Sequence, residues 1–170
     1  SEVFKLELLM KQAHVSIHDR TVVDAALERA ENTGAAAAAI ELPDGKILTG
    51  KTSNLLGPSA ALILNALKDL AGIDHNLHVI SPTAIEPIQK VKTQYLGSKN
   101  PRLHIDEILI ALSISSAANP AAQLAMEQLP KLKGCQVHTS VMLSSVDIKL
   151  FKKLGIQLTC EPKYEHNPIY

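Results

Sequence analysis

The chain has 170 residues, a length that fits one domain, and its 46% apolar and 20% charged residues are typical of a packed globular core. Lysine and arginine together number 17, as do aspartate and glutamate, so the net charge is zero, and this balance argues against nucleic acid or an anionic membrane as the main partner. Two cysteines are too few for a disulfide framework, and no apolar run is long enough to span a bilayer, so we expect a cytoplasmic protein.

Two helical patterns open the chain. Residues 2–14 carry apolar side chains on one helical stripe, and a second helix is predicted to end at Gly34. We expect the two helices to form a hairpin, residues 2–33, that leads into an α/β body at 34–162 and a polar tail at 163–170. Because the chain starts with serine rather than methionine and goes straight into a helix, we predict that it is a fragment of a longer protein.

A β-hairpin is predicted next. Residues 36–42 are apolar and are followed by a Pro-Asp-Gly turn at 43–45, which predicts a strand that ends in a turn. Residues 46–52 return as the second strand of the hairpin. A helix over 59–71 follows, because proline suits its first turn and glycine its end.

The later part of the chain alternates helices and strands. A βαβ unit closes it, and this unit predicts two parallel strands with a right-handed crossover. The helix at 105–118 is apolar on nearly all sides, so we expect it to be buried between layers. The predicted elements are a short buried strand at 77–80, helices at 83–96, 105–118 and 120–129, and the unit of strand 136–143, helix 145–154 and strand 156–160.

These elements predict the fold class of residues 1–170. We expect a single α/β domain, with α+β as the alternative, built on a mixed sheet of about five strands. The hairpin supplies an antiparallel pair, the βαβ unit a parallel pair, and helices cover both faces of the sheet.

The strongest motif match lies in the predicted hairpin. Residues 45–52 fit the phosphate-loop pattern G-x-x-x-x-G-K-[ST]. A working phosphate loop needs small or polar residues through its cradle and a helix that begins at the Gly-Lys-Thr. Residues 46–49 instead have the pattern of an extended strand, and Gly57-Pro58 interrupts any helix soon after. We therefore interpret the segment as a hairpin and predict no cofactor, with ATP or another phosphate ligand as the alternative.

A weaker form of the phosphate hypothesis survives at the end of the second hairpin strand. Lys51, Thr52 and Ser53 follow that strand, and the next helix begins near Ser59, so its free N–H groups point back toward them. Anions and ligands bind at this position in α/β proteins. These four residues are candidates for anion binding, and an ordinary loop with capping hydroxyls is the alternative.

Three consecutive polar residues interrupt the predicted strand at 136–143. Alternation places His138 and Ser140 on one face of the sheet and Thr139 on the other. His138 and Ser140 are therefore candidates for a catalytic base and nucleophile, and Thr139 for ligand binding. The alternative is a core histidine satisfied by hydrogen bonds, since no orienting acid is identifiable. The seven histidines show no zinc-type spacing, and we predict no metal site.

Four long runs of the sequence resemble one known family. The runs are GKTSNLLG, NPRLHIDEILIALSI, LPKLKGCQVHTSVMLSSVD and FKKLGIQLTCEP. From about Val3 to Pro162 the chain resembles the C-terminal part of the bacterial domain-of-unknown-function 1846 family, also called uncharacterised protein family 0371. The resemblance implies a longer cytoplasmic bacterial protein whose N-terminal part, absent here, carries its own Gly-rich segment G-P-G-S-G-K. It supplies no catalytic residues to transfer to this chain.

Two functional hypotheses follow. The first is an assembly or domain-docking module that binds the N-terminal domain of the same protein and forms a homo-oligomer. It is motivated by the neutral charge, the Ala/Leu-rich helices and the lack of a complete catalytic set. The alternative is that the domain contributes part of a phosphate- or nucleotide-ligand active site shared with the missing domain, with a hydrolase as the candidate enzyme class. Whether the protein is an enzyme stays open at this stage.

Overall fold

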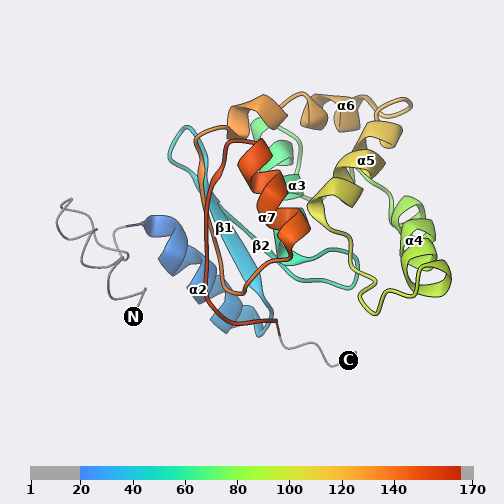
Figure 1. Ribbon diagram of the computed structural model, residues 1–170. Helices are drawn as coiled ribbons and strands as arrows, with labels where there is room; N and C mark the ends of the chain where they lie inside the picture. Colours follow the sequence, from blue (N-terminus) through green and yellow to red (C-terminus); the bar gives the residue numbers. More distant parts are fainter. Residues whose placement is uncertain (1–19, 166–170) are drawn as a thin grey trace.

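The computed structural model describes residues 20–165, which form a sheet covered by helices on both faces (Figure 1). The strands are β1 (Ala37–Glu41), β2 (Ile47–Lys51), β3 (Gln136–Thr139) and β4 (Gln157–Cys160), in the order β2-β1-β3-β4. β1 is antiparallel to both neighbours, and β3 is parallel to β4. The predicted mixed sheet, with its hairpin and its βαβ unit, is confirmed.

The sheet has four strands in the described part of the chain, so the predicted strand at 77–80 is wrong. Val79 and Ile80 are buried, as a strand would require, but they reach the core from a loop. Asp74 organises that loop: its side chain accepts from the N–H of Asn76 and its carbonyl from the N–H of Leu77. A short apolar run indicates burial, and burial alone does not distinguish a strand from a loop packed on the core.

The hairpin explains both glycines of the phosphate-loop pattern. Gly45 lies in the turn with φ of 87°, a left-handed conformation that glycine adopts without strain. Gly50 lies inside β2, where a Cβ atom would come 2.7 Å from Cα of Leu62. It therefore allows helix α3 (Pro58–Leu70) to pack directly on the strand. The predicted hairpin is confirmed, and residues 47–51 are extended where a phosphate loop would curve around its ligand.

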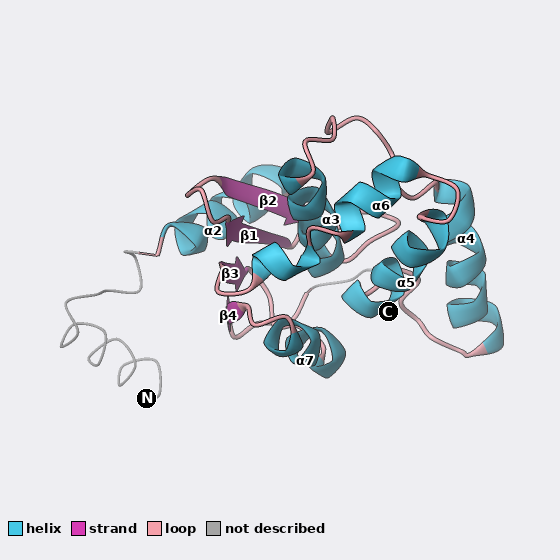
Figure 2. Cartoon of the chain, turned by 90° about the horizontal axis from the view of Figure 1, so that it is seen from above, coloured by secondary structure: helices cyan, strands magenta, loops and turns pink. Residues whose placement is uncertain are grey.

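Small side chains also let helix α2 (Thr21–Thr33) approach the opposite face of the sheet (Figure 2). Ala39 of β1 packs there against Val22 and Ala26, and all three are fully buried. This close approach explains the alanine-rich strand, because larger side chains would hold the helix away. The second predicted helix is confirmed and ends at Gly34, whereas the helix predicted at 2–14 lies outside the described residues.

The remaining helices form an outer group beyond α3 (Figure 2). None of the helices within residues 20–165 is long and apolar enough to cross a membrane. The predicted helix at 83–96 is α4 followed by a π turn, and the one at 120–129 is α6, after which a 3-10 turn begins. The elements of this group are α4 (Pro82–Lys90), η2 (Val91–Tyr95), α5 (Ile105–Ser115), α6 (Pro120–Met126) and η3 (Leu129–Leu132), and α7 (Ser145–Lys153) then crosses from β3 to β4.

Helix α5 is not buried on all sides, so that prediction is wrong. Its residues Ile105, Ile108 and Leu112 are fully buried, but Ile110 and Ile114 are 60% and 71% exposed. The physical reason is that α5 contacts α3, α6 and α7 from one side only. Two isoleucines, Ile110 and Ile114, therefore remain at the surface of the described structure beside the exposed Ser113.

Candidate functional site

The two polar segments singled out in the sequence meet at one edge of the sheet. The N–H of Thr52 donates to the carbonyl of Ala36 (2.8 Å), and the N–H of Ser140 donates to the carbonyl of Ala37 (2.8 Å). Both segments therefore flank the start of β1. This follows from the topology, because β1 runs antiparallel between β2 and β3 and so places their carboxyl ends at the same edge.

A cleft of about 820 Å³ opens at this edge. Its charged side chains come from four separate segments of the chain. The charged residues that line it are the cations Lys51, Arg102 and Lys163 and the carboxylates Glu31 and Glu165. Thr52, Ser53 and Ser140 also line the cleft. Ser59, His138 and Thr139 are buried and do not line it.

Thr52 lines this cleft and has a buried hydroxyl. The residue is only 7% exposed, and its Oγ1 has no hydrogen-bond partner among the described residues. The hydroxyl of Ser59, at the start of α3, is also buried without a hydrogen-bond partner among the described residues, but Ser59 does not line the cleft. A buried hydroxyl without a partner costs about 1–3 kcal/mol, so a native protein rarely keeps one without a reason. Thr52 lines the cleft, but its Oγ1 is buried beneath the cleft surface.

A second cleft of about 410 Å³ adjoins the first. Arg102, Val141, Tyr164 and Glu165 line both, so the two form neighbouring lobes of one depression. The smaller lobe contains the amino end of α3, where no side chain caps the free N–H groups of the first turn. It also contains a histidine and an aspartate that the sequence analysis did not select.

These two residues, His104 and Asp147, form a pair. Nδ1 of His104 lies 3.3 Å from Oδ2 of Asp147, and the other carboxylate oxygen accepts from the N–H of Ile105 (3.1 Å). Asp147 is buried, whereas the imidazole is 31% exposed. The hydrogen bond with Asp147 raises the pKa of His104, and burial opposes this rise.

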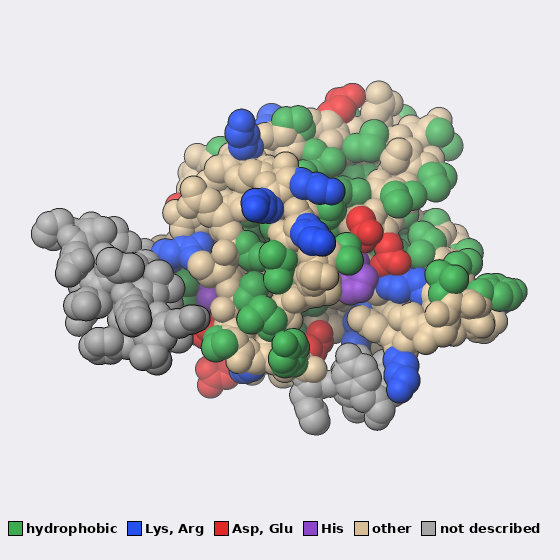
Figure 3. Space-filling model, viewed as in Figure 1, with side chains coloured by type: hydrophobic (Ala, Val, Ile, Leu, Met, Phe, Trp, Pro, Cys, Tyr) green, Lys and Arg blue, Asp and Glu red, His purple; other side chains and the backbone are tan. Residues whose placement is uncertain are grey.

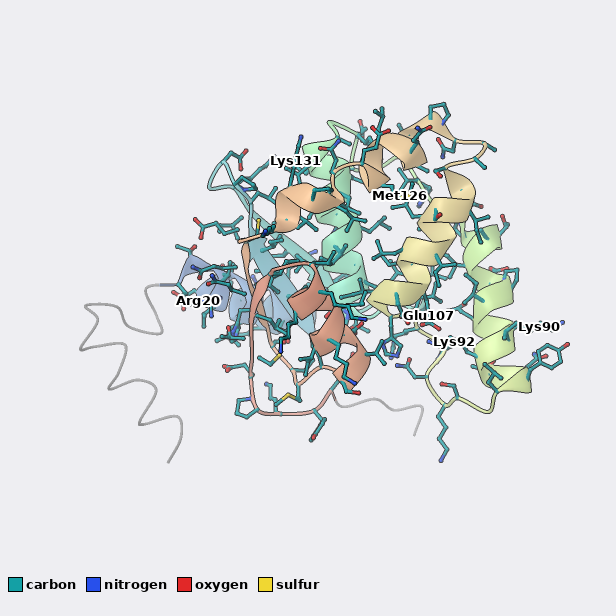
Figure 4. The ribbon with its side chains drawn as sticks, turned by 45° about the horizontal axis from the view of Figure 1, so that its top comes forward. Arg20, Lys90, Lys92, Glu107, Met126 and Lys131 are labelled. Atoms are coloured by element: carbon teal, nitrogen blue, oxygen red, sulfur yellow. The ribbon has the colours of Figure 1, made fainter. Side chains whose placement is uncertain are left out.

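A polar network holds the loop that supplies Arg102 and His104. Nζ of Lys92 donates to the carbonyl of Arg102 (2.6 Å) and to Oε1 of Glu107 (2.8 Å), and the same Glu107 oxygen accepts from the N–H of His104 (2.8 Å). Figure 4 shows Lys92 of η2 and Glu107 of α5 facing one another across this loop. Nε of Arg102 also donates to the carbonyl of Ser53 (2.7 Å). The loop is therefore tied to both helices and to the end of β2.

His138 is surrounded by structural partners on the α2 face of the sheet. The residue is 1% exposed, and its Nδ1 lies 2.6 Å from Oγ1 of Thr159. Arg20, at the start of α2, donates to the same Thr159 oxygen (2.6 Å). Burial lowers the pKa of His138, and the charge of nearby Arg20 lowers it further, while Glu161 opposes the shift. The ring is therefore neutral near pH 7.

Ser140 and Thr139 also have partners in the backbone. Oγ of Ser140 accepts from the N–H of Ala37 (2.9 Å), and Oγ1 of Thr139 donates to the carbonyl of Val141 (2.7 Å). Within residues 20–165, no hydrogen bond joins His138 to Ser140. The hydroxyls of Ser140 and Thr139 are thus satisfied by the backbone, whereas the buried Nε2 of His138 has no hydrogen-bond partner among the described residues and lies 3.7 Å from Oε2 of Glu161.

Tertiary structure, not local pattern, brings the missed residues together. His104 and Asp147 are 43 positions apart and come from different helices. In the sequence, Asp147 lies three residues after Ser144, which is the spacing of a helix cap. In the structure, the backbone N–H of Asp147 donates to Oγ of Ser144 (3.3 Å). A histidine directly before an apolar helix was the only local signal. No group of three or more metal-ligating side chains that could hold an ion occurs in residues 20–165.

The fold and the cleft define a class of protein. It is an α/β domain with a polar cleft at the carboxyl ends of β2 and β3, which run in the same direction. The C-terminal domain of unknown function DUF1846 matches residues 18–170, so the chain belongs to this family, as the resemblance predicted. The UPF0371 protein of Corynebacterium efficiens is 55% identical over 166 residues, which cover 98% of this chain and 34% of that protein. A UPF0371 protein of Streptococcus pyogenes is 49% identical over 170 residues, which cover 100% of this chain and 34% of the relative. The chain thus spans about a third of the length of these relatives.

Proposed function

We propose that this domain supplies one wall of a binding site for a phosphate-bearing ligand, and that the rest of a longer protein completes the site. The observation that carries the proposal is the cleft at the carboxyl edge of β2 and β3. There Lys51, Arg102 and Lys163 line one cleft together with Thr52, Ser53 and Ser140. Ligands in α/β sheets bind in the crevice at the carboxyl ends of the strands.

The electrostatics of the cleft favour an anion. Three cations outnumber two carboxylates in its lining, and Arg102 is fixed by its bond to the carbonyl of Ser53. Charge-assisted hydrogen bonds from arginine and lysine are the usual means of holding phosphate. The uncapped amino end of α3 adds partial positive charge in the adjoining lobe.

Calorimetric titration with inorganic phosphate and with ATP tests this proposal, on this chain and on the protein at its natural length. Lys51→Ala and Arg102→Ala should each weaken binding about tenfold or more, because each removes a hydrogen bond to a charged group. Lys90→Ala is the matched control, since Lys90 is exposed on α4 and does not line either lobe. Equal affinities in all variants, or no binding by either length of protein, would contradict the proposal.

An exposed apolar face supports docking as a second candidate function. Ile110 and Ile114 of α5 lie one turn apart, and Tyr95 and Leu96 at the end of η2 are also largely exposed. Figure 3 shows apolar side chains gathered over α4 and α5. Contiguous apolar surface of this kind marks interaction sites. Because the relatives are far longer than this chain, we propose that the rest of the longer protein covers it.

Replacing the apolar side chains with charges tests the docking proposal. The double variant Ile110→Glu/Ile114→Glu should lose binding to the separately produced remainder of the protein, measured by sedimentation. Ile148→Glu is the control, because Ile148 is a partly exposed isoleucine on α7, outside this face. If the parent chain instead self-associates through this face, the occupant is a second copy. A strict monomer that does not bind the remainder contradicts docking.

A further inference from the structure

The His104–Asp147 pair lines the smaller lobe of the cleft. Nδ1 is engaged by Asp147 at 3.3 Å, which leaves Nε2 without a protein partner among the described residues. His104 lines the smaller lobe beside Arg102, which both lobes share. A ligand whose phosphate contacts Arg102 would therefore extend toward the imidazole.

The carboxylate behind the ring is held from both sides. One oxygen of Asp147 accepts from the N–H of Ile105, and the N–H of Asp147 donates to Oγ of Ser144. Asp147 is thereby fixed between the start of α5 and the start of α7. A carboxylate held in this way sets both the orientation and the tautomer of the imidazole, with the proton of the neutral ring on Nδ1.

Two carboxylates hold backbone groups at the amino end of α5. The amino end of α5 is capped by Asp147, which binds the N–H of Ile105, and by Glu107, which binds the N–H of His104. Both contacts are made to backbone groups, and any side chain at position 104 would leave them in place. A partly exposed ring that lines a cleft and is oriented by a buried carboxylate is available for chemistry.

The charges around His104 suit an acid that works near neutral pH. Asp147 and Glu107 favour the imidazolium, whereas Lys92 and burial disfavour it, and the net effect raises the pKa of His104. An acid is most effective when its pKa lies near the working pH. The imidazolium also adds a positive charge to a lobe that already contains Arg102.

We propose that His104 is the general acid, and Asp147 its positioning residue, in the hydrolysis of a phosphate monoester bound across the two lobes; this rests on the phosphate binding proposed above. Nε2 of the imidazolium gives its proton to the bridging oxygen as the bond between phosphorus and that oxygen breaks. A water oxygen forms the new bond to phosphorus on the side opposite the leaving oxygen and releases its proton to solvent, and Nε2 takes up a proton from solvent before the next cycle. The products are an alcohol and inorganic phosphate.

Two substrates with different leaving groups test the acid. We would measure the hydrolysis of phenyl phosphate and of 4-nitrophenyl phosphate by the protein at its natural length. His104→Asn should lower kcat for phenyl phosphate by about 100-fold or more, the usual contribution of a general acid. It should affect 4-nitrophenyl phosphate far less, because 4-nitrophenolate leaves without a proton. His78→Asn is the control, since His78 is an exposed histidine outside both lobes.

The pH dependence of kcat in Asp147→Asn distinguishes a positioning role of Asp147 from a purely structural one. Because Asp147 raises the pKa of His104, the fall of kcat with rising pH should begin at lower pH in this variant. His104→Gln checks that the loss in His104→Asn does not depend on one substitution, and circular dichroism checks that both variants fold.

Phosphate affinity separates the two proposals. If inorganic phosphate does not bind, the proposed function fails, and the catalytic proposal falls with it. If phosphate binds, but His104→Asn hydrolyses phenyl phosphate at the parental rate, or the parent does not hydrolyse it at all, the catalytic proposal is overturned and the binding site stands. Equal losses with both substrates would also overturn the acid role.

Discussion

His104 and His138 are the same side chain in two different surroundings. His104 stands at the mouth of a cleft, where a buried carboxylate raises its pKa. His138 lies under α2, where burial and a nearby arginine lower its pKa. The sequence pattern favoured His138 as a candidate base, whereas the geometry favours His104. A polar residue inside a strand is conspicuous in a sequence, but its surroundings decide whether it serves the core or a ligand.

The comparison predicts that His138 matters more for stability than any residue of the cleft. His138→Ala should lower the free energy of unfolding by about 2–4 kcal/mol, because it leaves a cavity and removes the ring that contacts Thr159. Urea denaturation followed by circular dichroism measures the change. His78→Ala, at an exposed position, should alter stability by less than about 0.5 kcal/mol. A similar loss of unfolding free energy in His138→Ala and His78→Ala would contradict this prediction.

Asp147 should contribute to stability through the cap of α5 as well as through His104. Asp147→Ala removes the acceptor for the N–H of Ile105 and should reduce the free energy of unfolding by about 1–3 kcal/mol. His104→Asn, which leaves that cap intact, should have a smaller effect in the same urea titration. If His104→Asn were the more destabilising change, the imidazole would be part of the structural support of α5.

Thr52 and Ser140 are two buried hydroxyls at the same edge with opposite expected behaviour. Ser140→Ala removes the acceptor for the N–H of Ala37 and should destabilise the fold by about 1 kcal/mol. Thr52→Val removes a hydroxyl that has no protein partner, so stability should be unchanged or slightly higher. Phosphate affinity, measured by calorimetry, should be unchanged in Thr52→Val, because the buried Oγ1 does not reach the cleft surface. A destabilised Thr52→Val protein would mean that the hydroxyl has a structural partner after all.

The two histidines should give the stability opposite slopes with pH. The raised pKa of folded His104 adds stability that is fully present below its unfolded pKa of about 6.5 and is lost as pH rises through the folded pKa. The lowered pKa of folded His138 adds stability that is present above about 6.5 and is lost as pH falls through the folded pKa. In urea titrations from pH 5 to 8, the contribution of His104 to the midpoint of the parent protein should fall as pH rises. His104→Asn should not show this fall. Imidazole proton shifts in NMR spectra should show the two pKa values on opposite sides of 6.5. A shared pKa would remove the distinction.

Local sequence rules predicted most elements of the fold. The Pro-Asp-Gly turn and the apolar runs beside it specify the hairpin, because only glycine adopts the φ of Gly45 at little cost. Prolines and glycines likewise mark the ends of α3 and α7 within a few residues. The strand predicted at 77–80 failed because burial was inferred correctly but backbone pairing depends on a neighbouring strand edge. The exposed face of α5 could not be predicted, because an apolar pattern does not reveal which contacts lie within this part of the chain.

The candidate site was predicted in part. The sequence selected Lys51, Thr52 and Ser53, because their place after a strand and before a helix is a local feature. It did not select Arg102 or His104, because their partners lie at distant positions. The choice between a catalytic and a core histidine also required the surroundings of each ring.

The sequence by itself determined the α/β class, the hairpin, the βαβ unit and the family, since these depend on spacing, turn chemistry and runs of residue identity. Only the tertiary structure decided that β1 lies between β2 and β3, and this arrangement brings two polar strand ends to one edge. It also decided that the side chain of Asp147, whose own N–H is capped by Ser144, contacts His104 and the start of α5. The physical reason is that a hydrogen bond between residues 43 positions apart exists only when the packing of the helices brings them together.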